Sequence, residues 1–246
     1  YSVPLIEYDL DGNILQLQRN GTGGGSSTGV LIDDLSYTYS GLIPNHLESV
    51  TDAANITLGF KGAFSGYSYD FNGNLKTDSQ KGFSLSYNYL NLPYKAAFTT
   101  ANLNPNNDFI QWRYDAAGQK LQKKVTESSS LSTEKEYCNG IEYNNGVLEA
   151  IYFSEGRLTP DGMGFLYEYT LADHLGNNRV TFKDDGMGVA EVIDENHYYP
   201  FGMLIEGLTD RINPTDNDYL YNGKELDEEF GFNLHHLIQV WLQYLR

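Results

Sequence analysis

The chain of 246 residues has a single cysteine, Cys138, and few basic residues. One cysteine excludes a disulfide framework within the chain and a zinc site built from several cysteines. With 16 Lys and Arg against 33 Asp and Glu, the formal net charge is −17, and such a field repels nucleic acid and anionic lipid. An apolar run of about 20 residues, which a membrane-spanning helix needs, is also missing. Binding to DNA or RNA and insertion into a membrane are therefore disfavoured.

The abundant residues are aromatic residues and glycine, with 20 Tyr, 12 Phe and 25 Gly. Aromatic side chains suit the pleated surface of strands, and many strands need many glycine turns. Apolar and polar residues alternate over 35–39, 83–89 and 165–171, which is the pattern of half-buried strands. The runs follow one another too closely for helices to separate most of them. We therefore predict an all-β fold, an antiparallel β-hairpin strip that is open or partly closed.

A tyrosine followed by a short Asp/Asn-Gly turn recurs along the chain. Residues 8–13, 69–74 and 114–119 read YDLDGN, YDFNGN and YDAAGQ, and looser copies occupy 173–178 and 198–202. An Asp side chain can bond its own backbone two residues on, and Gly accepts the left-handed conformation of tight hairpins. A small unit used many times favours a scaffold. The residues that we assign to these structural turns are Asp9, Gly12, Asp70, Gly73, Asp115, Gly118, Asp173, His174, Gly176, Arg179, Pro200 and Gly202.

Two segments break this pattern. Residues 20–29 (NGTGGGSSTG) have the composition of a flexible loop. Residues 233–246 (NLHHLIQVWLQYLR) carry apolar residues at helical spacing, which predicts an amphipathic C-terminal helix. We divide the chain into a hairpin segment over 1–232 and an atypical helix over 233–246.

The signals for catalysis or metal binding are weak. Residues 25–29 match the G-x-S-x-G nucleophile elbow, but that motif needs a strand before it and a helix after it. Residues 9–13 lack the distal glutamate of a calcium loop. Cys138 has no identifiable base near it in the sequence, so we expect a buried apolar role. We predict no enzyme activity, no cofactor and no metal site.

Longer strings resemble the bacterial RHS (rearrangement hotspot) or YD-repeat proteins, specifically their RHS repeat-associated core. Residues 87–93 (YNYLNLP) are similar to one stretch of that core, and residues 140–146 (GIEYNNG) with 155–157 to another. Residues 173–182 (DHLGNNRVTF), 198–203 (YYPFGM) and 221–226 (YNGKEL) resemble further core strings, in the order in which the family has them. The resemblance covers roughly residues 1–232 and is specific because the strings occur together.

The resemblance implies a β-hairpin strip that spirals into a hollow shell, in a secreted or cell-surface bacterial protein. In relatives with toxin tails, the shell encloses or presents a C-terminal polypeptide. After Gly231 this chain departs from the family pattern, and no Asp-Pro dipeptide occurs in it. We therefore expect a fragment without signal peptide, closing strand, self-cleavage site or toxin.

The resemblance suggests a non-catalytic shell segment whose partner is the C-terminal toxin or effector segment of a longer parent chain. The alternative is an adhesion module that binds a glycan or a cell-surface protein through exposed aromatic residues, whose positions the sequence leaves unknown. For most tyrosines we expect core packing with the hydroxyl at the rim. Residues 187–246 hold eleven Asp and Glu against three Lys and Arg, and we interpret that excess of acid as a solubility feature.

Overall fold

The computed structural model describes residues 2–21, 29–43, 45–54, 59–60, 64–99, 103–128, 132–162, 164–198, 204–205, 217–227 and 229–231. In these residues the regular structure is β-strand throughout, apart from one 3₁₀ turn, η1 (Glu229–Gly231). All strand pairs are antiparallel, so the all-β hairpin prediction is confirmed. Across the same residues, no helix is long and apolar enough to span a bilayer. The helix predicted over 233–246 lies outside the described residues.

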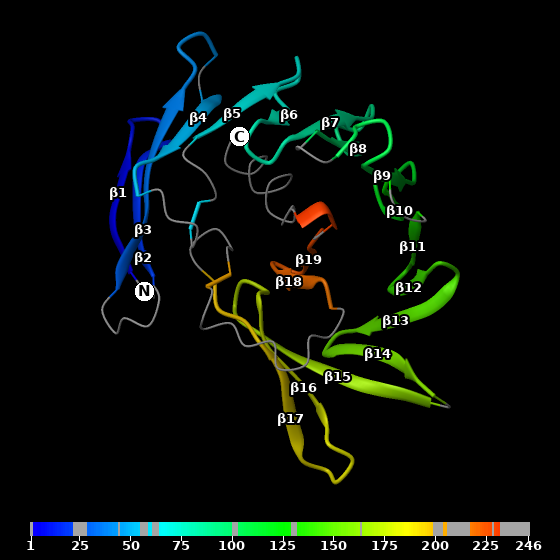
Figure 1. Ribbon diagram of the computed structural model, residues 1–246. Helices are drawn as coiled ribbons and strands as arrows, with labels where there is room; N and C mark the ends of the chain where they lie inside the picture. Colours follow the sequence, from blue (N-terminus) through cyan, green and yellow to red (C-terminus); the bar gives the residue numbers. More distant parts are fainter. Residues whose placement is uncertain are drawn as a thin grey trace. The chain divides into compact units, whose positions relative to one another are not determined.

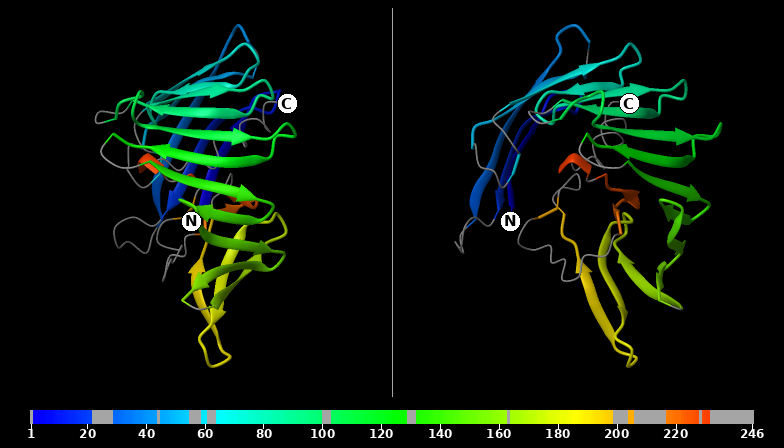
Figure 2. Two further views of the ribbon diagram at one scale, coloured as in Figure 1. Left: turned by 90° about the vertical axis from the view of Figure 1, so that its right-hand side faces the viewer. Right: turned by 45° about the vertical axis from the view of Figure 1, so that its right-hand side comes forward.

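The chain forms two compact units, and the first contains residues 1–106. Its strands pair in chain order as a meander (Figures 1 and 2). They are β1 (Ser2–Tyr8), β2 (Ile14–Gly21), β3 (Val30–Tyr39), β4 (Leu47–Asp52), β5 (Phe64–Tyr69), β6 (Leu75–Asp78), β7 (Phe83–Tyr87) and β8 (Pro93–Phe98). One face of this meander is buried and carries Leu35, Val50, Leu75, Leu85 and Phe98 together with the ion pair of Arg19 and Asp33.

The second unit contains residues 107–241, and its first nine strands form another meander. They are β9 (Phe109–Tyr114), β10 (Lys120–Thr126), β11 (Thr133–Cys138), β12 (Ile141–Asn144), β13 (Val147–Phe153), β14 (Gly156–Asp161), β15 (Gly164–Ala172), β16 (Asn178–Asp184) and β17 (Ala190–Glu195). A separate hairpin joins β18 (Tyr219–Tyr221) to β19 (Lys224–Glu225). We call residues 217–227 and 229–231 the docked segment, because their side chains form ion pairs and hydrogen bonds with residues of β10, β11 and β12.

Candidate functional site

The loop at residues 70–74 illustrates the hydrogen bonding of the repeated turns. The N–H of Asp70 donates to the carbonyl oxygen of Asn74 at 2.9 Å, and the N–H of Gly73 donates to the Asp70 carbonyl oxygen at 3.1 Å. The Asp70 carboxylate accepts from the backbone N–H groups of Asn72 and Asn74 and from the Asn74 amide, at 2.9 Å each. Gly73 has φ 82°, a left-handed conformation that costs an ordinary residue about 1–2 kcal/mol. The Asp and Gly of this repeat therefore close the turn.

Three further predicted loops have the same backbone bonds, namely those of Asp9, Asp115 and Asp173. Two more loops, which begin at Asn88 and Asp185, were not among the predicted repeats; in each, the first side chain accepts from the N–H groups two and four residues ahead. Each has a positive φ three residues later, 58° at Asn91 and 82° at Gly188. The signal was present in the sequence: an Asp or Asn followed three residues later by Gly or Asn, whether or not a tyrosine precedes it.

Successive loops of the first unit are fastened to one another by tyrosine. The tyrosine before one loop donates its hydroxyl to the carbonyl oxygen of the first residue after the preceding loop. These bonds join Tyr39 to Ile14 at 3.0 Å, Tyr69 to Leu47 at 2.9 Å and Tyr87 to Leu75 at 2.6 Å. Asn74 adds a bond from its amide to Asn91 of the next loop at 3.0 Å. Since a hydrogen bond of this kind contributes about 0.5–1.5 kcal/mol, the row of loops stabilises one end of the meander cumulatively.

In the second unit Tyr198 makes the equivalent bond, to the carbonyl oxygen of Asn178 at 2.8 Å. The guanidinium of Arg179 lies 5.5 Å from the centre of the Tyr198 ring, and its Nη2 lies 3.1 Å from Nδ1 of His197. His174 is exposed in its turn, where the neighbouring carboxylate of Asp173 makes the turn bonds. Pro200 and Gly202 lie outside the described residues.

One expectation about a single residue meets a clear outcome. Cys138 is exposed at the end of β11, so the prediction of a buried apolar role is wrong. The alternation that places a residue on one face of a strand does not say whether that face is covered. His46 stacks on the ring of Tyr69, with ring centres 4.5 Å apart and planes 8° from parallel. Of the G-x-S-x-G match over 25–29, only Gly29 lies within the described residues.

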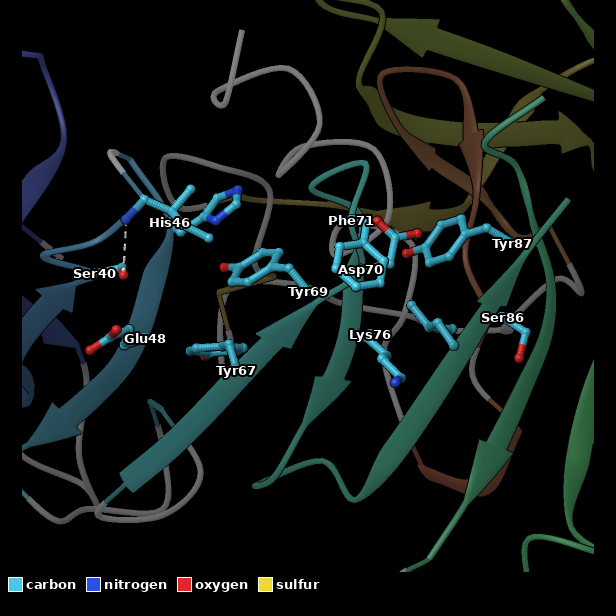
Figure 3. A pocket seen from close by; sticks show the side chains of 12 residues that line it. Ser40, His46, Glu48, Tyr67, Tyr69, Asp70, Phe71, Lys76, Ser86 and Tyr87 are labelled. Carbon is cyan, nitrogen blue, oxygen red and sulfur yellow. Dashed lines mark hydrogen bonds between the residues drawn. The ribbon is translucent and has the colours of Figure 1, made fainter. Parts of the chain in front are cut away.

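A pocket of about 760 Å³ opens beside this loop row in the first unit (Figure 3). Its lining includes Tyr67, Tyr69, Tyr87, His46 and Phe71. The hydroxyls of Tyr69 and Tyr87 already donate to backbone carbonyl oxygens, and burial raises the pKa of both phenols. These groups therefore hold the loops in place and are poor proton donors or acceptors at neutral pH.

The densest cluster of charge in the second unit lies between the sheet and the docked segment. Lys123 of β10 is 4% exposed, and its Nζ lies 2.8–3.0 Å from carboxylate oxygens of Glu225, Asp227 and Glu229. Lys120 contacts Glu225 at 2.5 Å. Burial opposes the charge of Lys123, but the three carboxylates outweigh it and raise the pKa of the ammonium. The ion pairs therefore fix the docked segment in place.

Lys135 of β11 forms the second centre of this cluster. Its Nζ lies 3.1–3.2 Å from carboxylate oxygens of Glu142, Glu149 and Asp218. The hydroxyl of Tyr219 donates to Glu142 at 2.6 Å. Burial raises the pKa of Asp218 to about 6, since the lysine charges offset only part of the desolvation.

The hydroxyl of Tyr137 donates to both oxygens of Glu225, at 2.7 and 2.9 Å. At the end of the hairpin, the backbone N–H of Asn222 donates to the side-chain oxygen of Asn177 at 3.0 Å. The docked segment is thus held by polar contacts along its length, from Asp218 to Glu229.

This cluster was not predicted from the sequence. The acids at 218, 225, 227 and 229 belong to the region whose acidity we had assigned to solubility, and for these four that assignment is wrong because they pair with buried lysines. The YNGKEL string over 221–226 was the one sequence signal for this segment. It predicts a turn, but it does not identify the strands against which the turn packs. The arrangement holds a later segment of the same chain by charge, and it pairs Lys120, Lys123 and Lys135 with carboxylates.

No protein-family model and no curated protein matches the chain. Solved structures do match in fold. A structure of TcdB2-TccC3 without the hypervariable C-terminal region matches with a TM-score of 0.53 and 14% identity, over 90% of this chain and 13% of the other. The Photorhabdus luminescens Tc holotoxin pore with a mutated TccC3 matches with a TM-score of 0.48 and 18% identity, over 90% of this chain and 14% of the other. The chain thus spans a small fraction of the chains it matches, and the first match shows a shared fold.

Proposed function

We propose that this chain is part of the wall of a YD-repeat shell, a non-catalytic scaffold that encloses or displays a C-terminal toxin or effector segment. The docked segment is the observation that carries the proposal. A hairpin sheet here holds a later stretch of the same chain through buried ion pairs, centred on Lys123 and Lys135. This is what a wall must do to retain a polypeptide.

Three further points support the proposal. The row of similar loops builds a repeating sheet whose length is set by the number of hairpins. The fold likeness is to a toxin complex whose structure was solved without a hypervariable C-terminal region. The RHS-type strings over 87–93, 140–157 and 173–182 resemble a family of shells. By the same resemblance, the parent protein is secreted or displayed on a bacterial surface.

The test uses the longer parent protein that carries the polypeptide after this region. Added protease should digest the C-terminal polypeptide at least about 100-fold more slowly than the same polypeptide free in solution, because retention hides its backbone from the enzyme. Lys123→Met in the parent should abolish much of that protection. A C-terminal polypeptide digested at the free rate in the parent protein would contradict the proposal.

The alternative function, an adhesion module that binds a glycan or a cell-surface protein, has one supporting observation: aromatic residues are exposed on β15, with Tyr167 52% and Phe165 49% accessible. A glycan array with the folded chain tests its glycan-binding form. A blank array removes that form, and binding that Tyr167→Ala abolishes would establish it.

A further inference from the structure

Four hairpin loops at one end of the first unit each hold a large apolar side chain in solvent. The loops follow β1, β3, β5 and β7, at residues 9–13, 40–46, 70–74 and 88–92. In an antiparallel meander alternate loops lie at the same end of the sheet. The four side chains are Leu10 at 106%, Leu42 at 94%, Phe71 at 111% and Tyr89 at 82% accessible, and we call them the apolar row.

Closure of the turns does not account for the apolar row. In three loops the first side chain accepts from the N–H groups two and four residues ahead, so the residue next to it takes no part in these bonds. That residue is Leu10, Phe71 or Tyr89. Turns of this kind favour Gly, Asn, Asp and Ser, and an apolar side chain in water is unfavourable. The row therefore has a cost to the free chain that the turns do not explain.

Contacts between neighbouring loops hold the apolar row in place. These contacts are the Asn13 amide to Asn45 at 2.7 Å, the stacked rings of His46 and Tyr69, and the Asn72 amide to Asn91 at 2.9 Å. Neighbouring strands lie about 4.8 Å apart and each hairpin contributes two strands, so successive tips lie about 10 Å apart along the sheet end. The four side chains thus extend over about 30 Å.

The apolar row exposes enough surface for an interface. With large apolar side chains of about 200 Å² each, the four expose on the order of 700 Å². Ile43 beside Leu42 is 53% exposed, and Leu90 beside Tyr89 is 37% exposed, so both add to this area. A specific interface buries about 800 Å² per partner. The loop ends supply an area of that size from apolar side chains.

The pocket of the first unit lies beside the apolar row. Its volume is about 760 Å³, and its lining includes Ile43 and His46 of one loop and Phe71 of the next (Figure 3). Tyr69 and Tyr87 also line it. This space is larger than a single side chain and is walled largely by rings. The loop ends therefore present projecting apolar side chains together with a cavity that can receive one from a partner.

The charge around the apolar row is negative. The charged residues of the four loops, and of the two residues on either side of each, are Glu7, Asp9, Asp11, Glu48, Asp70 and Lys76. Five carboxylates against one lysine give a formal net charge of −4. The turn bonds of Asp9 and Asp70 come from neutral donors and do not cancel their charge. This field repels anionic lipid and a second copy of a chain with net charge −17, and it attracts a cationic partner.

The spacing of the apolar row fits a helix better than an extended peptide. The apolar stripe of an amphipathic helix repeats about every seven residues, which is about 10.5 Å along its axis. That distance is close to the separation of about 10 Å between successive tips. An extended peptide covers about 10 Å in three residues, and residues three apart in a strand point to opposite faces. A helix of about 21 residues is about 32 Å long and spans the whole row.

We propose that the apolar row is a docking surface for a cationic amphipathic helix of a separate protein. The helix lies along the loop ends with its apolar stripe on Leu10, Leu42, Phe71 and Tyr89, and one of its large side chains enters the pocket. Lysine and arginine beside the stripe face the carboxylates of the loops, which sets the orientation and speeds association. The site belongs to the first unit and does not involve the docked segment, so it stands apart from the proposed shell function.

The test is fluorescence anisotropy of a labelled synthetic peptide titrated with the full chain. The peptide has about 21 residues of leucine, lysine and glutamine, with the leucines on one face of the helix at heptad spacing. We expect a Kd of about 1–100 µM. Binding should weaken several-fold when NaCl is raised from about 0.1 to 1 M, since the Debye length falls from about 10 to 3 Å.

Substitutions in the full chain locate the site. Phe71→Ser should raise the Kd by about 10–100-fold, because burial of one large apolar side chain contributes about that factor. Leu42→Ser is a second variant in the row and should act in the same direction. Met187→Ser is the matched control, because Met187 is 84% exposed in a loop of the second unit, and it should leave the Kd unchanged.

A peptide of the same composition, with its leucines spread around the helix, is the control ligand and should bind at least about 10-fold more weakly. Circular dichroism checks that the variants fold. Absence of binding at about 100 µM overturns the proposal, and so does equal binding of the two peptides, which would reflect net charge alone. A Kd that Phe71→Ser and Leu42→Ser leave unchanged, or that Met187→Ser raises equally, also overturns it. Binding to phosphatidylcholine vesicles through Phe71, without binding of the peptide, would assign the row to lipid instead.

Discussion

Replacing Lys123 with methionine removes a buried charge while keeping a side chain of similar length. Its Nζ lies 3.0, 2.9 and 2.8 Å from carboxylates of Glu225, Asp227 and Glu229. At an effective dielectric constant of about 20, opposite charges about 3 Å apart attract by roughly 5–6 kcal/mol, and desolvation offsets most of that. Without the lysine, three carboxylates face one another across an uncharged side chain. We expect the free energy of unfolding to fall by about 3–5 kcal/mol.

The assay is urea unfolding followed by tryptophan fluorescence, since Trp112 of β9 is 4% exposed and belongs to the second unit. With a slope of about 2 kcal/mol/M, the midpoint for Lys123→Met should fall by about 2 M. Lys124→Met is the control because Lys124 lies on the same strand, is partly exposed and takes part in none of the ion pairs described for the docked segment. Equal destabilisation by the two substitutions would refute the reasoning, since the effect would then come from the strand and not from the cluster.

Three further predictions concern the pH dependence and the turns. Burial raises the pKa of Asp218 to about 6, so its contribution to stability grows as the pH falls from 7 towards its unfolded value of 3.8. Burial opposes the charge of Glu225, but its lysine partners outweigh burial and lower its pKa to about 2. The stability that Glu225 contributes is therefore lost as the pH falls from 4.5 through 2. Thermal unfolding should give a stability maximum between about pH 4 and 6. Asp70→Ala should cost about 1–2 kcal/mol in urea unfolding, because three donors of the turn lose their acceptor. Gly156→Ala should cost about 1–3 kcal/mol, because its Cβ would lie 1.9 Å from a carbonyl oxygen of β15.

Each of these predictions has a matched control. A flat pH profile from 7 to 4 in the wild type, or the same profile in Asp218→Asn, would contradict the assignment of the pH effect. Asp11→Ala changes an exposed carboxylate that accepts none of the turn bonds described for its loop, and it should cost less than Asp70→Ala. Gly164→Ala has open space around its Cβ, and a cost as large as that of Gly156→Ala would show that the contact with β15 is not the cause.

The turns could be predicted from the sequence because their hydrogen bonds are local. Asp70 bonds atoms two and four residues ahead, so the residues that form the loop are neighbours in the chain. The loop at Asn88 was missed because Asn replaces Asp at its first position and Asn91 takes the place of the glycine, although the family string over 87–93 contains it. Local chemistry of this kind can be recognised without knowledge of the rest of the fold.

The docked segment could not be predicted from the sequence, because its contacts are not local. Lys123 and Asp227 are 104 residues apart in sequence, and no local pattern pairs them. Strand β15 shows a second limit. Alternation over 165–171 identified which residues share a face, but it did not identify Tyr167, which is 52% exposed, as an exception to the core packing expected for most tyrosines. Period-two patterning separates two faces of a strand and does not determine which face is covered.

Hydrogen–deuterium exchange of the docked segment tests the central claim most directly, namely that the sheet of the second unit holds a later stretch of the chain. The amides to follow are those of Asn222, bonded to Asn177, and of Leu226, bonded to Asp218 at 2.8 Å. Both should exchange at least about 100-fold more slowly than in an unstructured peptide, and they should lose that protection in Lys123→Met. Exchange at the unstructured rate in the wild-type chain would contradict the claim.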